Sequence, residues 1–125
     1  MEKFSIKKRL QSFKYAFNGL KIMFRNEHNA WIHSVAALVV IGAGCWFGIS
    51  KNEWYLIVLV IALVLLTEAI NTAIEHLANA VTPEKNVHIG KAKDVAAGAV
   101  LLAAIAAAIV GLMIFIPHLL ERFNL

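Results

Sequence analysis

The sequence predicts an all-α membrane protein, with an N-terminal amphipathic surface helix followed by three transmembrane helices. Of its 125 residues, 60% are hydrophobic and only 16% are charged, and the mean hydropathy is +0.70. A soluble domain is nearer half apolar and a quarter charged. Three segments approach or exceed the roughly 20 apolar residues that cross a hydrocarbon core about 30 Å thick. The length allows one compact unit, so we expect a single domain over residues 1–125.

The segment before the first span, residues 5–28, is predicted to be a helix lying on the membrane surface. Apolar side chains recur in it at helical spacing, with lysines and arginines largely between them: Ile6, Leu10, Phe13, Phe17, Leu20 and Phe24. Such a pattern is typical of a helix in the interface with its apolar face down. A free basic tail would leave the aromatic side chains exposed to water. The segment also lacks the short apolar core and cleavage site of a signal peptide.

The apolar runs and the two prolines set the expected boundaries of the spans. Nothing in the second span breaks the helix before Pro83, and Pro117 closes the third apolar run. Cys45, the single cysteine, lies in the first run, where we expect a small apolar side chain rather than a disulfide. The predicted spans are residues 30–49, 54–81 and 94–116, with a loop over residues 82–93.

The lysines and arginines predict the orientation. Seven precede the first span and three lie in the loop after the second: Lys3, Lys7, Lys8, Arg9, Lys14, Lys21, Arg25, Lys85, Lys91 and Lys93. Only Lys51 and Arg122 lie on the other side. The excess predicts that the N-terminus and the loop are cytoplasmic. The net charge of +4 therefore indicates topology and contact with anionic lipid, and we expect no nucleic-acid partner.

A polar stripe ends the second span. Glu68, Asn71, Glu75 and Asn79 recur every three or four residues, so they share one helix face. Counted from Trp54 at the outer interface, Glu68 lies about 21 Å into the span, below the cytoplasmic headgroups. Glu75 lies about 32 Å in, near the water boundary. A carboxylate at the depth of Glu68 is a functional candidate, and we expect a general base. The alternative is that the stripe only joins helices by hydrogen bonds.

Further charged residues lie at the predicted cytoplasmic boundary. Glu27 precedes the first span, and Lys93 and Asp94 begin the third. Phosphate chemistry uses Mg²⁺ held by carboxylates and by substrate phosphates, with cations beside the developing charge. Glu27 and Glu75 are therefore candidate metal ligands. Alternatively, Asp94 is a helix cap and Lys93 an interfacial anchor. The stretch "HIGKAKD" lacks the spacing of a Walker A loop.

Three stretches together resemble one family: "NEHNAWIH", "EAINTAIE" and "GKAKDVAAGAV". They are similar to the small bacterial integral-membrane diacylglycerol kinases and undecaprenol kinases, over about residues 15–117. The stretches "IEH" and "IVGLMIFIPHLL" look more like the undecaprenol kinase branch. The resemblance implies an ATP- and Mg²⁺-dependent kinase that phosphorylates the primary hydroxyl of a membrane lipid, undecaprenol in preference to diacylglycerol. It also implies a homotrimer in the bacterial inner membrane, with active sites shared between protomers.

The resemblance also implies roles for individual residues. Glu68 matches the catalytic base, and Glu27 and Glu75 match the glutamates that hold Mg²⁺ against ATP. Asn71 supports them in the polar stripe, and Ala97 falls at a lipid-facing position. The remaining nucleotide-contacting positions are Lys8, Tyr15, Glu84, Lys85, Asn86, Lys93 and Asp94.

Three departures from the family pattern lie on the nucleotide side. Asn79 stands where the motif usually has aspartate, and Lys8 stands where arginine is usual. Lys85 and Asn86 replace a common pair that contains His or Tyr. Nucleotide preference is therefore less determined than the type of reaction.

Two other functions compete with the kinase prediction. A small multidrug-type exporter subunit also buries one glutamate in a short helical chain, but it leaves "GKAKD" and Glu27 without a role. A non-catalytic assembly protein would use the polar stripe only to join subunits. Within the first span, His33 is expected to pair with a polar neighbour or a lipid headgroup in a structural role.

Small residues repeat along one face of the third span. They recur every four residues, at Ala99, Ala103, Ala107 and Gly111. Such faces let helix backbones approach closely in membranes. We therefore expect this face to pack against another helix, the alternative being that it meets only lipid.

Overall fold

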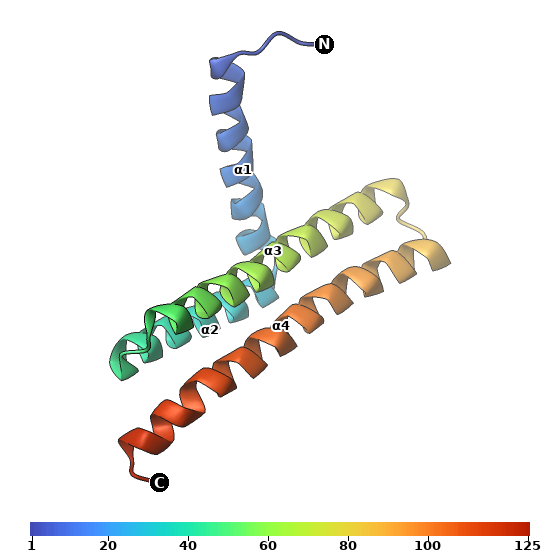
Figure 1. Cartoon of the computed structure of the whole chain (residues 1–125). Helices are drawn as coiled ribbons and strands as arrows, with labels where there is room; N and C mark the ends of the chain where they lie inside the picture. Colours follow the sequence, from blue (N-terminus) through green and yellow to red (C-terminus); the bar gives the residue numbers. More distant parts are fainter.

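The computed structural model describes all residues, 1–125, and folds them into four α-helices (Figure 1). They are α1 (Ile6–Asn26), α2 (His28–Phe47), α3 (Lys51–Val81) and α4 (Val87–Arg122). The predicted class of all-α membrane protein is confirmed. Every regular element is an α-helix, and α2, α3 and α4 are each long and apolar enough to cross a membrane. These three helices lie alongside one another, whereas α1 projects away from them (Figure 1).

Helix α1 touches the rest of the chain only near its C-terminal end. Its single buried residue is Met23, and its apolar side chains from Ile6 to Phe17 are exposed. A surface helix requires such an apolar face without a protein partner. Extended backbone at Glu27 separates α1 from α2. Across this corner the indole N–H of Trp31 donates to the backbone oxygen of Phe24, at 2.6 Å.

The turn between α2 and α3 depends on two glycines and a helix cap. Gly48 adopts a left-handed conformation with φ of 63°, which favours glycine. Gly44 lies against the indole of Trp54, where an added Cβ would approach a ring carbon to 2.7 Å. Ser50 and Glu53 form a capping box. Because of this cap α3 begins at Lys51, three residues before the predicted start of the second span.

The third long helix is longer than predicted at both ends. The loop covers residues 82–86 rather than 82–93, because the Asn86 side chain accepts hydrogen bonds from the backbone N–H groups of His88 and Ile89 and so starts α4 at Val87. At the other end, α4 continues through Pro117 to Arg122, although proline removes one backbone hydrogen bond.

Contacts with α2 and α3 hold the last turns of α4. The His118 ring nitrogen Nε2 lies 3.1 Å from the Glu53 carboxylate. The Arg122 guanidinium lies 4.2 Å from the centre of a Trp46 ring, which is a cation–π contact. Beside them, Ile49, Ile57 and Ile114 form a small apolar core. This end of the molecule is therefore tied together by packing, whereas the polar stripe of α3 lies toward the other end.

Helices α3 and α4 run antiparallel and form the most extensive contact in the chain (Figure 1). Val64, Ala78, Ala96 and Val100 are buried along it. On the small-residue face of α4, Ala103 is buried with 4% of its surface exposed, and Ala107 and Gly111 are half-buried. Ala99 is exposed. The prediction that this face packs against a helix is therefore met at Ala103, whereas Ala107 and Gly111 line an open cavity.

Candidate active site

The centre of the site is Glu68 on α3, which is fully buried, with 0% of its surface exposed. Neither of its carboxylate oxygens has a hydrogen-bond partner, and the same holds for the side-chain oxygen of Asn71, one turn further along. The neighbouring Thr72 hydroxyl donates to the backbone oxygen of Glu68, at 3.0 Å. Buried oxygens without a donor cost free energy. A ligand that brings a hydroxyl donor therefore gains by binding here.

A cavity of about 240 Å³ opens beside Glu68. Asn29 and His33 of α2 and Asn71 of α3 supply its polar lining, and α4 supplies only apolar side chains, namely Ala97, Val100, Leu101 and Ala104. The structure thus brings together the predicted base, the supporting asparagine and the predicted lipid-facing alanine. The lining, polar on α2 and α3 and apolar on α4, suits an alcohol group carried on a hydrocarbon chain.

His33 is the nearest basic side chain to Glu68. Its ring nitrogen Nε2 lies 3.7 Å from Oε2 of Glu68. The expected polar neighbour is therefore a glutamate that the sequence already marks as functional. Spacing along the chain does not predict this pair, because it depends on how α2 crosses α3. The available signal was a histidine within an otherwise apolar span.

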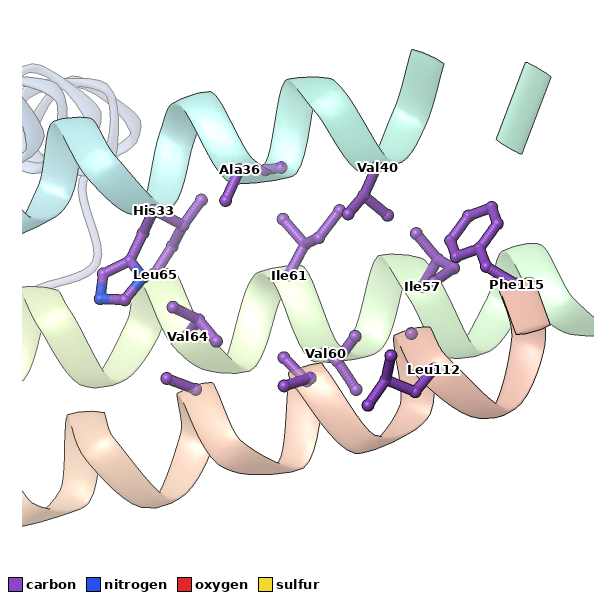
Figure 2. Close-up of a pocket in the computed structure, with 15 residues that line it drawn as sticks. His33, Ala36, Val40, Ile57, Val60, Ile61, Val64, Leu65, Leu112 and Phe115 are labelled. Carbon is purple, nitrogen blue, oxygen red and sulfur yellow. The ribbon is translucent and has the colours of Figure 1, made fainter. Parts of the chain in front are cut away.

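A second, apolar cavity of about 460 Å³ adjoins the first and shares His33 and Ala104 with it. Figure 2 shows its lining, which runs along α2, α3 and α4 from His33 at one end to Phe115 at the other. His33 therefore lies at the junction between the polar cavity of Glu68 and an apolar groove.

The two candidate metal ligands, Glu27 and Glu75, are neighbours. Glu27 lies at the corner between α1 and α2, and Glu75 lies on α3. Burial, then hydrogen bonding with Glu75 and the negative charges of Glu75 and Glu68, raise the pKa of Glu27 from 4.5 to about 7. The side chains of Asn26 and His76 lie 3.3 Å apart and connect this corner to α3. Two carboxylates that resist joint ionisation suit a divalent cation, which relieves their repulsion.

The chain offers no cluster of three or more His, Cys, Asp or Glu side chains for a metal ion. Mg²⁺ is usually held by only one or two carboxylates, together with substrate phosphates and water. The pair of Glu27 and Glu75 therefore fits a Mg²⁺ that arrives with a phosphate-bearing ligand.

Four of the predicted nucleotide-contacting residues line one open pocket of about 440 Å³ between the ends of α3 and α4: Glu84, Lys85, Asn86 and Lys93. Asn79 lines it too, and Lys93 donates a hydrogen bond to the Asn79 side chain. Asn86 also caps α4 with its side-chain oxygen. Asp94 is exposed and lies outside this pocket.

Two predicted nucleotide contacts remain apart from the others within the chain. Lys8 lies near the start of α1, where its ammonium contacts Glu2 at 2.7 Å. Tyr15 is 71% exposed on the same helix. Because α1 projects from the bundle (Figure 1), one chain alone does not bring either residue to the carboxylates.

Comparison with known proteins places the chain in a family. The family model "Prokaryotic diacylglycerol kinase" matches residues 14–115. The chain belongs to the prokaryotic diacylglycerol kinase family. It is 38% identical to the undecaprenol kinase of Bacillus subtilis over 109 residues, which cover 87% of this chain and 89% of that one. It is also 38% identical to a diacylglycerol kinase of Synechocystis (90% and 65% covered) and 30% identical to that of Escherichia coli K12 (83% and 85%).

As a member of the prokaryotic diacylglycerol kinase family, the protein is a lipid kinase and a multi-pass membrane protein of a bacterial family. The kinase prediction is therefore confirmed over the exporter and assembly alternatives. Family membership also implies the use of ATP and Mg²⁺. Relatives named for two different lipids are equally similar to the chain, so similarity alone does not choose the lipid.

Proposed function

We propose that this protein transfers the γ-phosphate of ATP to the primary hydroxyl of undecaprenol, with Glu68 as the general base. The observation that carries the proposal is the Glu68 carboxylate, buried beside a cavity with both oxygens free of protein donors. The substrate hydroxyl donates to this carboxylate. As the hydroxyl oxygen bonds to the γ-phosphorus, its proton moves to Glu68 and the bond to the bridging oxygen breaks, releasing ADP. Asn71 and Ala97 line the same cavity and contact the lipid.

The metal and nucleotide lie at the adjoining boundary in this proposal. Glu27 and Glu75 would hold Mg²⁺, and the raised pKa of Glu27 beside Glu75 supports a shared cation. Bound there with ATP, the ion would neutralise charge on the phosphate oxygens. The open pocket of Glu84, Lys85, Asn86 and Lys93, with the neighbouring Asp94, contacts the nucleotide.

The working unit is a homotrimer whose active sites are shared between protomers. The separation of Lys8 and Tyr15 from the carboxylates within one chain supports sharing, because a neighbour's α1 then supplies them. The broad apolar surface of the single chain also supports contacts with lipid and with further copies. The protein spans the bacterial inner membrane in this proposal. The charge distribution supports a cytoplasmic location for both the N-terminus and the α3–α4 loop. ATP and Mg²⁺ are available on that side.

The proposed choice of undecaprenol over diacylglycerol is supported by two stretches of the sequence rather than by overall identity. The stretches "IEH" and "IVGLMIFIPHLL" resemble the undecaprenol kinase branch, and the Bacillus subtilis undecaprenol kinase matches over most of both chains. Both lipids offer a primary hydroxyl at headgroup depth, so one base serves either of them.

The test supplies pure protein in nanodiscs with undecaprenol or diacylglycerol at equal mole fraction and measures initial transfer of labelled γ-phosphate. We expect faster phosphorylation of undecaprenol and no ATP consumption without a lipid alcohol. Faster phosphorylation of diacylglycerol would overturn the lipid assignment. Glu68→Gln keeps the side-chain shape but accepts no proton, so we expect a loss of about 10²- to 10⁴-fold with MgATP binding retained. Activity within a few-fold of wild type would overturn the role of Glu68.

A further inference from the structure

The environment of Glu68 is asymmetric in charge. Of the side chains that line its cavity, His33 is the only one able to carry positive charge; the others are two asparagines and four apolar residues of α4. The other titratable groups that influence this region are the acids Glu75 of α3 and Glu27 at the α1–α2 corner. A buried carboxylate near two further acids requires a compensating donor or cation. Within the chain, His33 is the only candidate for such a cation, and the two asparagines of the cavity make no hydrogen bond to the carboxylate.

The geometry of the pair fits a contact through one carboxylate oxygen. The distance of 3.7 Å joins Nε2 of His33 to Oε2 of Glu68, which is within ion-pair range and longer than a hydrogen bond of about 2.7–3.2 Å. His33 is 22% exposed as a side chain, whereas Glu68 is fully buried. Asn29 and His33 are four residues apart, so they lie on the same face of α2, the face that closes the cavity.

We propose that His33 is a positioning residue, which holds Oε2 of Glu68 through Nε2 so that Oε1 is directed at the substrate hydroxyl. This inference rests on the proposed role of Glu68 as the base. Since neither oxygen has a hydrogen-bond donor in the chain, the contact with His33 is the one that selects an orientation of the carboxylate. General-base catalysis requires the accepting oxygen within hydrogen-bond reach of the proton. His33 therefore affects the rate of the chemical step and leaves nucleotide binding unchanged.

The experiment compares three substitutions of His33 in the full chain, reconstituted in nanodiscs with undecaprenol and MgATP. The amide nitrogen of a glutamine reaches about as far from the backbone as Nε2 of the histidine that it replaces. The amide nitrogen of the shorter asparagine reaches only as far as Nδ1 of that histidine. We expect His33→Gln to stay within a few-fold of wild type in kcat. His33→Leu and His33→Asn are expected to lower kcat by about 10- to 100-fold, the cost of a misplaced group, with unchanged KM for MgATP.

A second comparison separates positioning from a purely structural role. In the Glu68→Gln background, His33→Leu is expected to lower the residual rate no further, because the base that it positions is already lost. As a matched control, His118→Leu breaks the histidine–glutamate pair at the other end of the bundle. That control is expected to lower the thermal unfolding temperature in detergent while leaving kcat unchanged.

The possible outcomes are distinct. If Glu68→Gln is inactive while His33→Leu and His33→Asn keep the wild-type rate, the His33 inference is overturned and the base remains. If Glu68→Gln is itself active, the proposed base fails first. Equal losses for all three His33 variants, or losses that multiply with that of Glu68→Gln, would also overturn positioning. If His33→Leu does not fold, the comparison of the glutamine and asparagine variants decides.

Discussion

Lys93 of α4 donates a hydrogen bond to Asn79 of α3, with 3.4 Å between Nζ and the amide oxygen. The contact joins the two longest helices beside the loop that connects them. It also gives a physical meaning to a departure from the family pattern, in which Asn79 stands where the motif usually has aspartate. An amide orients the lysine without neutralising its charge, so that the charge stays available to a phosphate group.

Asn79→Asp is expected to raise the KM for MgATP, because an ion pair would neutralise part of the charge that Lys93 offers. Exposed ion pairs contribute about 1 kcal/mol or less, so the rise is at most about fivefold, and kcat stays unchanged. Initial-rate titrations with MgATP measure it. The effect should disappear in a Lys93→Met background and weaken at high salt. An unchanged or lower KM would contradict the account.

Glu27→Ala and Glu75→Ala are each expected to raise the Mg²⁺ concentration needed for activity and to weaken MgATP binding. If the two carboxylates hold one ion, the loss in the double variant falls well short of the sum of the two single losses. Mg²⁺ titrations of activity measure the coupling. Glu121→Ala, an exposed carboxylate in the last turn of α4, serves as a control with an unchanged Mg²⁺ requirement. Full additivity would exclude a shared ion.

The raised pKa of Glu27 predicts a pH dependence of stability in metal-free protein. The folded-state pKa of about 7 exceeds the ordinary value of 4.5, so the folded state binds the proton more tightly. The corresponding stabilisation is complete below about pH 4.5 and is lost as the pH rises through about 7. The thermal stability of the wild type, measured in detergent with a chelator, should therefore fall over that pH range relative to the stability of Glu27→Gln. Mg²⁺ at pH 8 should reduce the difference; parallel curves with chelator would contradict the prediction.

Ala103→Ile is expected to destabilise the protein, because Ala103 is 4% exposed where α4 packs. Overpacking of this kind costs about 1–3 kcal/mol. Leu102→Phe is the matched control, since Leu102 is 71% exposed on the adjacent position of the same helix. Thermal stability and oligomer size in mild detergent measure both variants. Equal behaviour of the pair would show that the small-residue face carries no packing.

The fold class and the membrane spans were predictable from the sequence, because they depend on composition and periodicity. Apolar length determined the spans, and the depth of Glu68 along its helix marked it as buried. Helix ends were less predictable, because they depend on single side chains. The Asn86 cap starts α4 before the predicted span. At the other end, contacts of His118 and Arg122 stabilise the turns that follow Pro117. The pairing of His33 with Glu68 follows from the relative rotation of two helices, which no pattern within either helix encodes.

The corner between α1 and α2 has a mechanical consequence. Glu27 is both the residue at which the chain changes direction and one of the two facing carboxylates. Helix α1 has 21 residues and is therefore about 32 Å long, so it acts as a lever arm pivoting at that residue. A change in the tilt of α1 would therefore turn the backbone that carries the Glu27 side chain. Such a tilt would reach the carboxylate pair from outside the cavity beside Glu68.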